Sequence, residues 1–196
     1  MAMADLGVKV YYSKIPVGEI DFTPKSRERA VDISAVKNDR LRKEKAYAWR
    51  LLEYAIANRG INVDELDFEK NENGKWVCDK CYFSLSHTHG AVAVAVSDFS
   101  VGVDIEKVSV RANNVAKKVF SSGELEGCDG DEILYTTRLW TKKESIFKTL
   151  DLRVFSPQSI VISEHETKTL ELDFDGEKYV VSVAGVGAEN AEFYEK

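Results

Sequence analysis

The feature that most constrains the fold is Ala91-Val-Ala-Val-Ala-Val96, a continuous run of six apolar residues. In a strand, successive side chains point to opposite faces, so this run would be apolar on both faces. Such a strand belongs in the middle of a sheet that is covered on both sides. The run therefore predicts a layered protein with elements packed against each face of its sheet.

Strands and helices of ordinary length surround this run. Asn38 and Gly60 are suitable residues to begin and end one long helix, and acidic residues at the start of a second suit the helix dipole. The predicted helices are 38–58, 111–119 and 131–150. The other predicted strands are 8–12, 82–86, 101–106, 159–163, 169–174 and 178–183. This order predicts an α+β fold with mostly antiparallel pairing.

Composition narrows the class of protein and its partners. The 196 residues contain no apolar run of the ~20 residues that a membrane span needs, and no signal peptide is visible. Three cysteines without a spacing framework indicate a reducing cytoplasmic setting. The net charge of −6 argues against a nucleic-acid binder. Residues 25–50 carry nine basic and four acidic groups, a local +5 that suits an anionic ligand or an acidic partner.

Two segments place carboxylates where they could bind a cation. In Val101-Gly-Val-Asp-Ile-Glu106, the carboxylates of Asp104 and Glu106 share one face of a strand and suit Mg²⁺ better than Zn²⁺. Glu144 and Lys148 lie one turn apart on the helix after Trp140 and could add a third ligand and a charge-stabilising ammonium. The alternatives are a solvated strand end and a surface Glu–Lys pair.

Three further motifs are weaker when taken alone. Ser86 and His87 follow a strand and could contact a phosphate, while the pair His87 and His89 is only half of a metal site. There is no Gly-x-Ser-x-Gly elbow for a hydrolase. Cys78-Asp-Lys-Cys81 would need two more ligands to bind zinc and lacks the strand-then-helix context of a redox motif, so we interpret it as a loop.

In order and spacing, these segments resemble the larger, surfactin-synthetase-activating type of 4'-phosphopantetheinyl transferase. Gly74-Lys75, Phe83–His87 and Val101–Glu106 match three family motifs, and Phe120–Glu124 and Trp140–Lys148 match two more. Trp76 replaces the family's proline and Ser84 its asparagine. The resemblance covers about residues 74–148.

The resemblance implies a fold and an activity. It implies two pseudo-twofold-related α+β halves, residues 1–98 and 99–196, with antiparallel sheets and coenzyme A in the cleft between them. The protein would transfer the 4'-phosphopantetheine arm of coenzyme A to a serine of an acidic apo acyl or peptidyl carrier protein. The reaction would use Mg²⁺ and release adenosine 3',5'-bisphosphate, and the protein would act as a monomer.

The resemblance also assigns roles to individual residues. The metal ligands would be Asp104, Glu106 and Glu144. Lys148 would stabilise charge, and Glu124 or Glu144 would activate the carrier serine. Coenzyme A phosphates would contact Lys75, Ser86, His87 and Lys143, and the nucleotide end would contact Arg42 and Lys43. Two alternatives stay open: an inactive coenzyme A or nucleotide binder of this fold, and a Mg²⁺-dependent phosphohydrolase. The carrier could serve fatty acid, polyketide or nonribosomal peptide synthesis.

Overall fold

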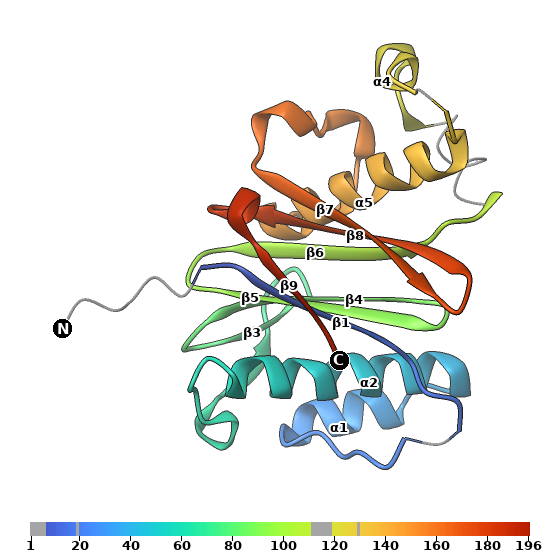
Figure 1. Cartoon of the computed structure of the whole chain (residues 1–196). Coiled ribbons are helices and arrows are strands. Elements are labelled where there is room, and N and C mark those ends of the chain that lie inside the picture. Colours follow the sequence, from blue (N-terminus) through green and yellow to red (C-terminus); the bar gives the residue numbers. More distant parts are fainter. Residues whose placement is uncertain (1–6, 19, 111–118, 129) are drawn as a thin grey trace.

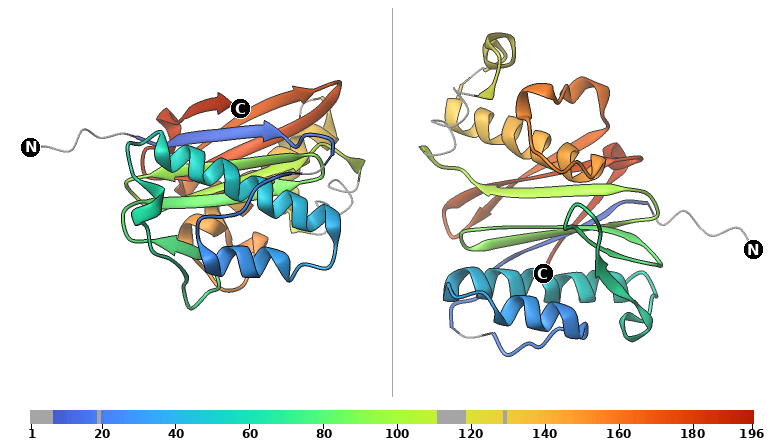
Figure 2. Two further views of the ribbon diagram at one scale, coloured as in Figure 1. Left: turned by 90° about the horizontal axis from the view of Figure 1, so that it is seen from below. Right: turned by 180° about the vertical axis from the view of Figure 1, so that it is seen from behind.

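The protein is built of two sheets that lie face to face between two layers of helices (Figure 1). The computed structural model describes residues 7–18, 20–110, 119–128 and 130–196. Helices α1 (Arg27–Ser34) and α2 (Asp39–Ala57) cover the first sheet, and α5 (Glu132–Leu150) covers the second. Figure 2 shows the same order of layers from below and from behind. The predicted α+β class is therefore confirmed.

Most neighbouring strands are antiparallel. The first sheet contains, in spatial order, β4 (Tyr82–Thr88), β5 (Ala91–Ser97), β1 (Lys9–Lys14) and β9 (Glu192–Glu195). The second contains β6 (Val101–Lys107), β8 (Glu177–Gly185) and β7 (Thr167–Phe174). A separate two-stranded sheet pairs β2 (Phe68–Lys70) with β3 (Trp76–Cys78). Only β1 and β9 run parallel among these described pairs.

Strand β5 is buried on both faces, as its sequence predicts. Val92, Val94 and Val96 belong to the core beneath α2, which is centred on Trp49. The alternate alanines 91, 93 and 95 belong to the core between the two sheets. Both sets are fully buried. Small side chains on the second face leave room for the branched residues of the opposing sheet.

Strand β6 carries apolar and polar residues on opposite faces. Val101, Val103 and Ile105 pack into the core between the sheets. Gly102 faces α5 so closely that a Cβ atom there would lie 1.9 Å from the carbonyl oxygen of Ser145. A side chain at this position would push the helix away, so glycine permits the close packing that holds α5 over Asp104.

The two halves of the chain repeat one topology. β1, α2, β4 and β5 form a strand, a helix and a hairpin whose last strand pairs with the first. β6, α5, β7 and β8 do the same. This repeat is compatible with two related halves, while the boundary at residue 98 and the twofold axis stay predictions.

The structure corrects several details of the sequence prediction. Residues 159–163 are not a strand: short turns at η2 (Pro157–Ser159) and η3 (Ile162–Glu164) flank Ile160, which packs on Ile146 of α5. The apolar residues there cover the helix and do not extend a sheet. β4 runs two residues beyond its predicted end. Most of the predicted helix 111–119 lies outside the described residues.

The two long predicted helices are confirmed, with Asn38 and Asp131 as their N-caps. The prediction lacks helix α1 and strands β2, β3 and β9. It also lacks the short elements α4 (Ser122–Glu126), η1 (Val63–Glu65) and η4 (Ala188–Asn190). None of the helices in the described part of the chain is both long and apolar enough to cross a membrane.

Candidate active site

Asp104 is the centre of the candidate site. Its side chain is 6% exposed. Its Oδ1 atom accepts hydrogen bonds from Ser86 Oγ and Lys148 Nζ, each at 2.7 Å. Its Oδ2 atom is buried and has no hydrogen-bond partner among the described residues. Lys148 also donates to the carbonyl oxygen of Val103 at 3.0 Å. The helix, the first sheet and the second sheet therefore meet at one carboxylate.

Glu106 and Glu144 add two partly buried carboxylates to this centre. Burial, followed by repulsion from Asp104, raises the pKa of Glu106 to about 7. The same two causes raise the pKa of Glu144 to about 7. Glu106 also accepts a hydrogen bond from Thr88 Oγ1 at 2.9 Å. Lys148 forms the ion pair with Asp104, so the cluster retains unneutralised negative charge once these groups ionise.

The donor set of this cluster fits Mg²⁺. Carboxylate oxygen is the ligand type that this hard cation prefers. Asp104 Oδ2 is a buried oxygen available for such a bond. However, no three or more His, Cys, Asp or Glu side chains in the described ranges form a ready metal centre. The described residues thus provide ligands of the right chemistry, but they are not preassembled into a metal site of three or more such ligands.

Strand β4 supports the cluster through every second residue. Ser84 Oγ accepts the backbone N–H of Val103 at 3.0 Å. Ser86 and Thr88 donate to Asp104 and Glu106. Three hydroxyls on one face of β4 therefore bind successive groups of β6, which lies beside it in the other sheet. Ser84, where the resembled family has asparagine, thus has a structural role here.

His87, on the opposite face of β4, lies at a cation-rich end of the site. Burial and the positive charges of Lys148, Lys45 and Arg29 lower its pKa to about 4. His87 is therefore neutral near pH 7, and its 3.3 Å contact between Nδ1 and Glu44 Oε2 is not an ion pair there. A neutral imidazole beside several cations favours an anionic ligand.

Lys75 joins this site from the turn before β3. Its Nζ atom donates to the carbonyl oxygen of Lys148 at 2.8 Å, which links the turn to α5. Burial is the main cause that lowers the pKa of Lys75, and the charge of Lys148 lowers it further. Gly74, Lys75 and Trp76 line a cavity of about 230 Å³ together with Lys148. The structure therefore brings Ser86, His87 and Lys148 together around Asp104, and Lys75 joins them through the backbone of Lys148.

Sequence reasoning missed Lys45 and Arg29 as individual candidates. Both lie within electrostatic reach of His87. Lys45 is four residues after Leu41 and three before Ala48, so it falls on the apolar face of α2. A lysine on the apolar face of a helix is unusual, and this position could have identified Lys45 as a candidate site residue from the sequence. Arg29 is only 6% exposed and lies over the rings of Trp49 and Trp76, at 4.8 and 5.5 Å from their centroids.

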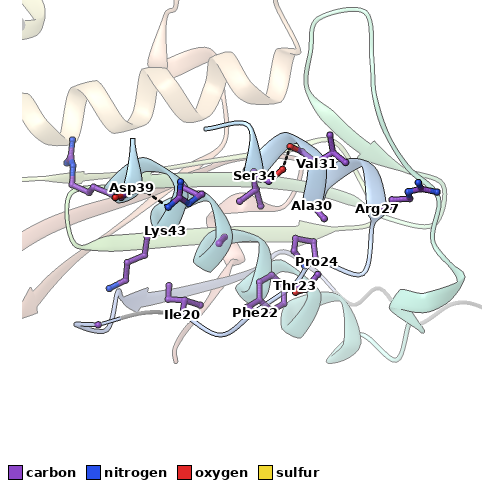
Figure 3. Close-up of a pocket in the computed structure, with 15 residues that line it drawn as sticks. Ile20, Phe22, Thr23, Pro24, Arg27, Ala30, Val31, Ser34, Asp39 and Lys43 are labelled. Atoms are coloured by element: carbon purple, nitrogen blue, oxygen red, sulfur yellow. Dashed lines mark hydrogen bonds and ion pairs between the residues drawn. The ribbon is translucent and has the colours of Figure 1, made fainter. Parts of the chain in front are cut away.

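Arg42 and Lys43 lie elsewhere, on a cavity of about 970 Å³ between α1, α2 and the segment before α1. In Figure 3, Lys43 and Asp39 lie at one end of this cavity and Arg27 at the other. Arg42 bonds Asp39 at 2.6 Å, and Lys43 donates to the carbonyl oxygen of Pro16 at 2.5 Å. No hydrogen bond or ion pair in the described ranges joins either side chain to the Asp104 cluster.

Glu124 and Lys143 form a separate pair on the outer side of α5. Their Oε1 and Nζ atoms are 2.5 Å apart, and Lys143 also donates to the carbonyl oxygen of Pro157 at 2.7 Å. Glu124 caps α4 by accepting from the N–H of Ser121. The pair lines a cavity of about 710 Å³. The structure therefore does not bring Glu124 and Lys143 into the carboxylate cluster.

The fold and site define a class of protein: an α+β protein that holds acidic and basic groups together along the edge strands β4 and β6 of its two sheets. Such a site suits a phosphate-containing ligand with an accompanying cation. A sequence profile of the 4'-phosphopantetheinyl transferase superfamily matches residues 100–190, which include β6 and α5.

Three relatives carry the same family name. The 4'-phosphopantetheinyl transferase gsp of Aneurinibacillus migulanus is 30% identical over 60% of this chain and 52% of its own length. The transferase psf-1 of Bacillus pumilus is 31% identical over 45% of this chain and 41% of its own. The transferase ffp of Bacillus subtilis is 30% identical over 63% of this chain and 66% of its own.

The chain belongs to the 4'-phosphopantetheinyl transferase superfamily. The predicted family is thereby confirmed. The match to the first two relatives spans about half of their length, 52% and 41%.

Proposed function

We propose that this protein transfers the 4'-phosphopantetheine arm of coenzyme A to a serine of an acidic apo carrier protein and releases adenosine 3',5'-bisphosphate. The observation that carries the proposal is the ion pair of Asp104 with Lys148, flanked by the two other carboxylates. The cations around His87 support it because coenzyme A is a polyanion. The family names of the relatives point to the same reaction.

The proposed reaction needs charge neutralisation and alignment more than a strong nucleophile. The serine oxygen attacks the phosphorus that carries the pantetheine arm, and the bond to the bisphosphate oxygen breaks. Lys148, which bonds Asp104, would place a positive charge beside the pyrophosphate, and Lys75 and His87, which lie near Lys148, would contact the phosphates. Asp104, Glu106 and Glu144 would hold Mg²⁺, which supplies charge neutralisation on the pyrophosphate when it is bound.

The serine proton needs an acceptor, and the two candidates differ in their surroundings. Glu144 has its pKa raised to about 7, which suits a base that works near neutral pH. The bonds to Lys143 and Ser121 lower the pKa of Glu124 despite its partial burial. A paired carboxylate of low pKa is the weaker base, so the surroundings of the two carboxylates favour Glu144 for this role.

The test is mass spectrometry of an apo carrier protein incubated with the full chain, coenzyme A and Mg²⁺. The proposal predicts that the carrier gains one phosphopantetheine and that a carrier with its serine replaced gains none. Release of adenosine 3',5'-bisphosphate without any carrier would indicate a phosphohydrolase instead. Binding of coenzyme A without either product would indicate an inactive binder. The variant Asp104→Asn, which keeps the side-chain shape, serves as the negative control.

A further inference from the structure

Two cysteine sulfurs face each other where β3 ends and the three-residue connection to β4 closes, at Cys78 and Cys81. Cys78 Sγ and Cys81 Sγ are 3.6 Å apart, and both thiols are free. A disulfide bond is about 2.05 Å long, so the sulfurs need to approach by only about 1.5 Å. The third cysteine, Cys128, follows α4 in another part of the chain. This pair is not used by the proposed transfer.

The two sulfurs have different surroundings, and the difference assigns them different roles. Cys78 is partly exposed, whereas Cys81 is 8% exposed and belongs to the core beneath α2. The Cys81 thiol and the backbone N–H groups of Lys80 and Cys81 stabilise the Cys78 thiolate against the effects of burial and Asp79, and lower its pKa to about 6. The hydrogen bond with Cys78, followed by burial, raises the pKa of Cys81. Arg59 and Asp98 are charged groups near its thiol, with opposite effects on that pKa. Cys78 is therefore the accessible nucleophile and Cys81 the internal partner.

We propose that Cys78 and Cys81 form a reversible dithiol–disulfide site that low-molecular-weight disulfides oxidise. The Cys78 thiolate attacks one sulfur of the disulfide RSSR, forms a mixed disulfide and expels RS⁻. Cys81 then attacks Cys78 Sγ, completes the intrachain disulfide and displaces the second RS⁻. The two cysteines lose two electrons and two protons, which the oxidant recovers as two RSH molecules.

The position of the pair connects it to the candidate active site. Cys81 lies in the core and directly precedes β4, which is held in place by pairing with β5 along its whole length and by the bond of Ser84 to Val103. Cys78 ends the short strand β3, whose neighbours before it are Trp76 and Lys75. The approach of the two sulfurs therefore moves β3 more than β4. Since Lys75 bonds the carbonyl oxygen of Lys148, oxidation displaces a group that lines the site.

The chemical test uses the full chain, glutathione disulfide as the probe and alkylation of the remaining thiols. Wild-type protein should lose two of its three alkylatable thiols together and regain both with dithiothreitol. The matched control Cys128→Ser, which retains only Cys78 and Cys81, should lose and regain both of its thiols. Cys81→Ala should accumulate a persistent glutathione adduct at position 78. Cys78→Ser should react at least tenfold more slowly. A persistent adduct on the wild-type chain, or equal oxidation of Cys78→Ser, would overturn the proposal.

A second readout examines the nucleophile itself. The rate of Cys78 alkylation should reach half of its maximum near pH 6 in the wild-type chain. In Cys81→Ala the loss of the thiol donor should move this midpoint upward, toward the ordinary cysteine value of about 8.5. An unchanged midpoint would mean that Cys81 does not activate Cys78.

The effect on the site rests on the proposed function. Oxidised wild-type protein should show a severalfold higher KM for coenzyme A, which reduction reverses, whereas the same treatment should leave Cys78→Ser unchanged. An unchanged KM in active, verified disulfide-containing protein would overturn the link to the site. The mass and alkylation measurements need no transferase activity, so they decide the redox chemistry even if the proposed function fails.

Discussion

At the scale of single residues, the raised pKa values of Glu106 and Glu144 follow from burial next to a third carboxylate. Ser86 and Lys148 both donate to the Oδ1 atom of that third carboxylate, Asp104. Glu106 and Glu144 are buried beside Asp104, and the negative charge of Asp104 repels theirs. The arrangement costs stability in the empty protein, and it is typical of sites that bind a cation together with an anionic ligand.

Glu144→Gln tests the catalytic part of this view. The change keeps the shape of the side chain but removes one charge and the favoured proton acceptor. We expect kcat for carrier modification to fall by about a hundredfold or more. The melting temperature of the empty protein at pH 8 should stay equal or rise, because one repelling charge is gone. The exposed variant Glu189→Gln is the control, and wild-type activity in Glu144→Gln would refute the assignment.

Glu106→Gln tests how much the buried carboxylate of Glu106 destabilises the folded protein, because this effect depends on pH. The pKa of Glu106 is about 7 in the folded protein against 4.5 in the unfolded chain, so the folded state binds the extra proton between these values. Stability from this proton is fully present below pH 4.5 and is lost as the pH rises through 7. Glu106→Gln should therefore match the wild type near pH 4.5 and become more stable above pH 7.

The expected difference at pH 8 is on the order of 2 kcal/mol in the free energy of unfolding. Urea denaturation at several pH values, without divalent cations, measures it. A difference that shrinks as the pH rises would contradict the raised pKa.

At the scale of elements, the position of α5 on β6 controls whether the site assembles. Glu144 and Lys148 are on the helix, and Asp104 is on the strand. The helix approaches so closely because its buried residues include Thr141 and Ser145 and because Gly102 has no side chain. Thr141 also hydrogen-bonds Ser182 of β8 at 2.7 Å, which secures the helix across the sheet.

Gly102→Ala should separate these two elements. The added methyl group would meet the backbone of α5, at 1.9 Å from the carbonyl oxygen of Ser145 and 2.7 Å from the N atom of Thr149. Backbone atoms cannot yield as a flexible side chain does, so we expect a loss of about 3 kcal/mol in unfolding free energy. Transferase activity should fall further than stability alone explains.

Gly123→Ala is the matched control for this substitution. A methyl group there meets nothing within 4 Å and lies in helix α4. It should leave stability unchanged or raise it slightly, since alanine favours helix. Circular dichroism melts and transfer rates for both variants measure the contrast, and equal melting temperatures would argue against the role of Gly102.

At the scale of the whole molecule, the negative and positive charges of the candidate site lie in different regions. Carboxylates gather between β6 and α5, while cations from α1, α2 and α5 surround His87. A separate group of basic residues lines the large cavity shown in Figure 3. The molecule thus offers two basic regions, on different parts of α2, for the 3'-phosphate of coenzyme A.

Paired variants decide between these regions. Lys45→Ala should raise KM for coenzyme A by roughly ten- to a hundredfold and change that for dephospho-coenzyme A much less, because a charge-assisted bond contributes ~1.5–3 kcal/mol. Arg42→Ala/Lys43→Ala tests the choice made from sequence, and we expect a smaller effect because those side chains lie on the other cavity. Steady-state kinetics with both cofactors measure the difference. The opposite ranking would place the 3'-phosphate at Arg42 and Lys43.

The sequence by itself determined the parts of the fold that local pattern controls. The apolar run at 91–96 required a strand covered on both faces. The cap residue Asn38 and the acidic residues from Asp131 onward marked the starts of the long helices. Alternation along 101–106 put Asp104 and Gly102 on the face opposite the core. These features depend on neighbouring residues in the chain, so a single sequence is enough to predict them.

Only the tertiary structure decided how distant residues meet. The region 159–163 has a strand-like pattern, but packing on α5 turns it into two short turns. Lys143 and Lys148 are both basic residues of one helix, yet Lys143 pairs with Glu124 and Lys148 with Asp104 because they lie on different faces. The approach of Cys78 to Cys81 and of Lys45 to His87 likewise depends on how strands and helices pack. Side chains far apart in sequence acquire their charge state and partners from that packing, which local pattern does not specify.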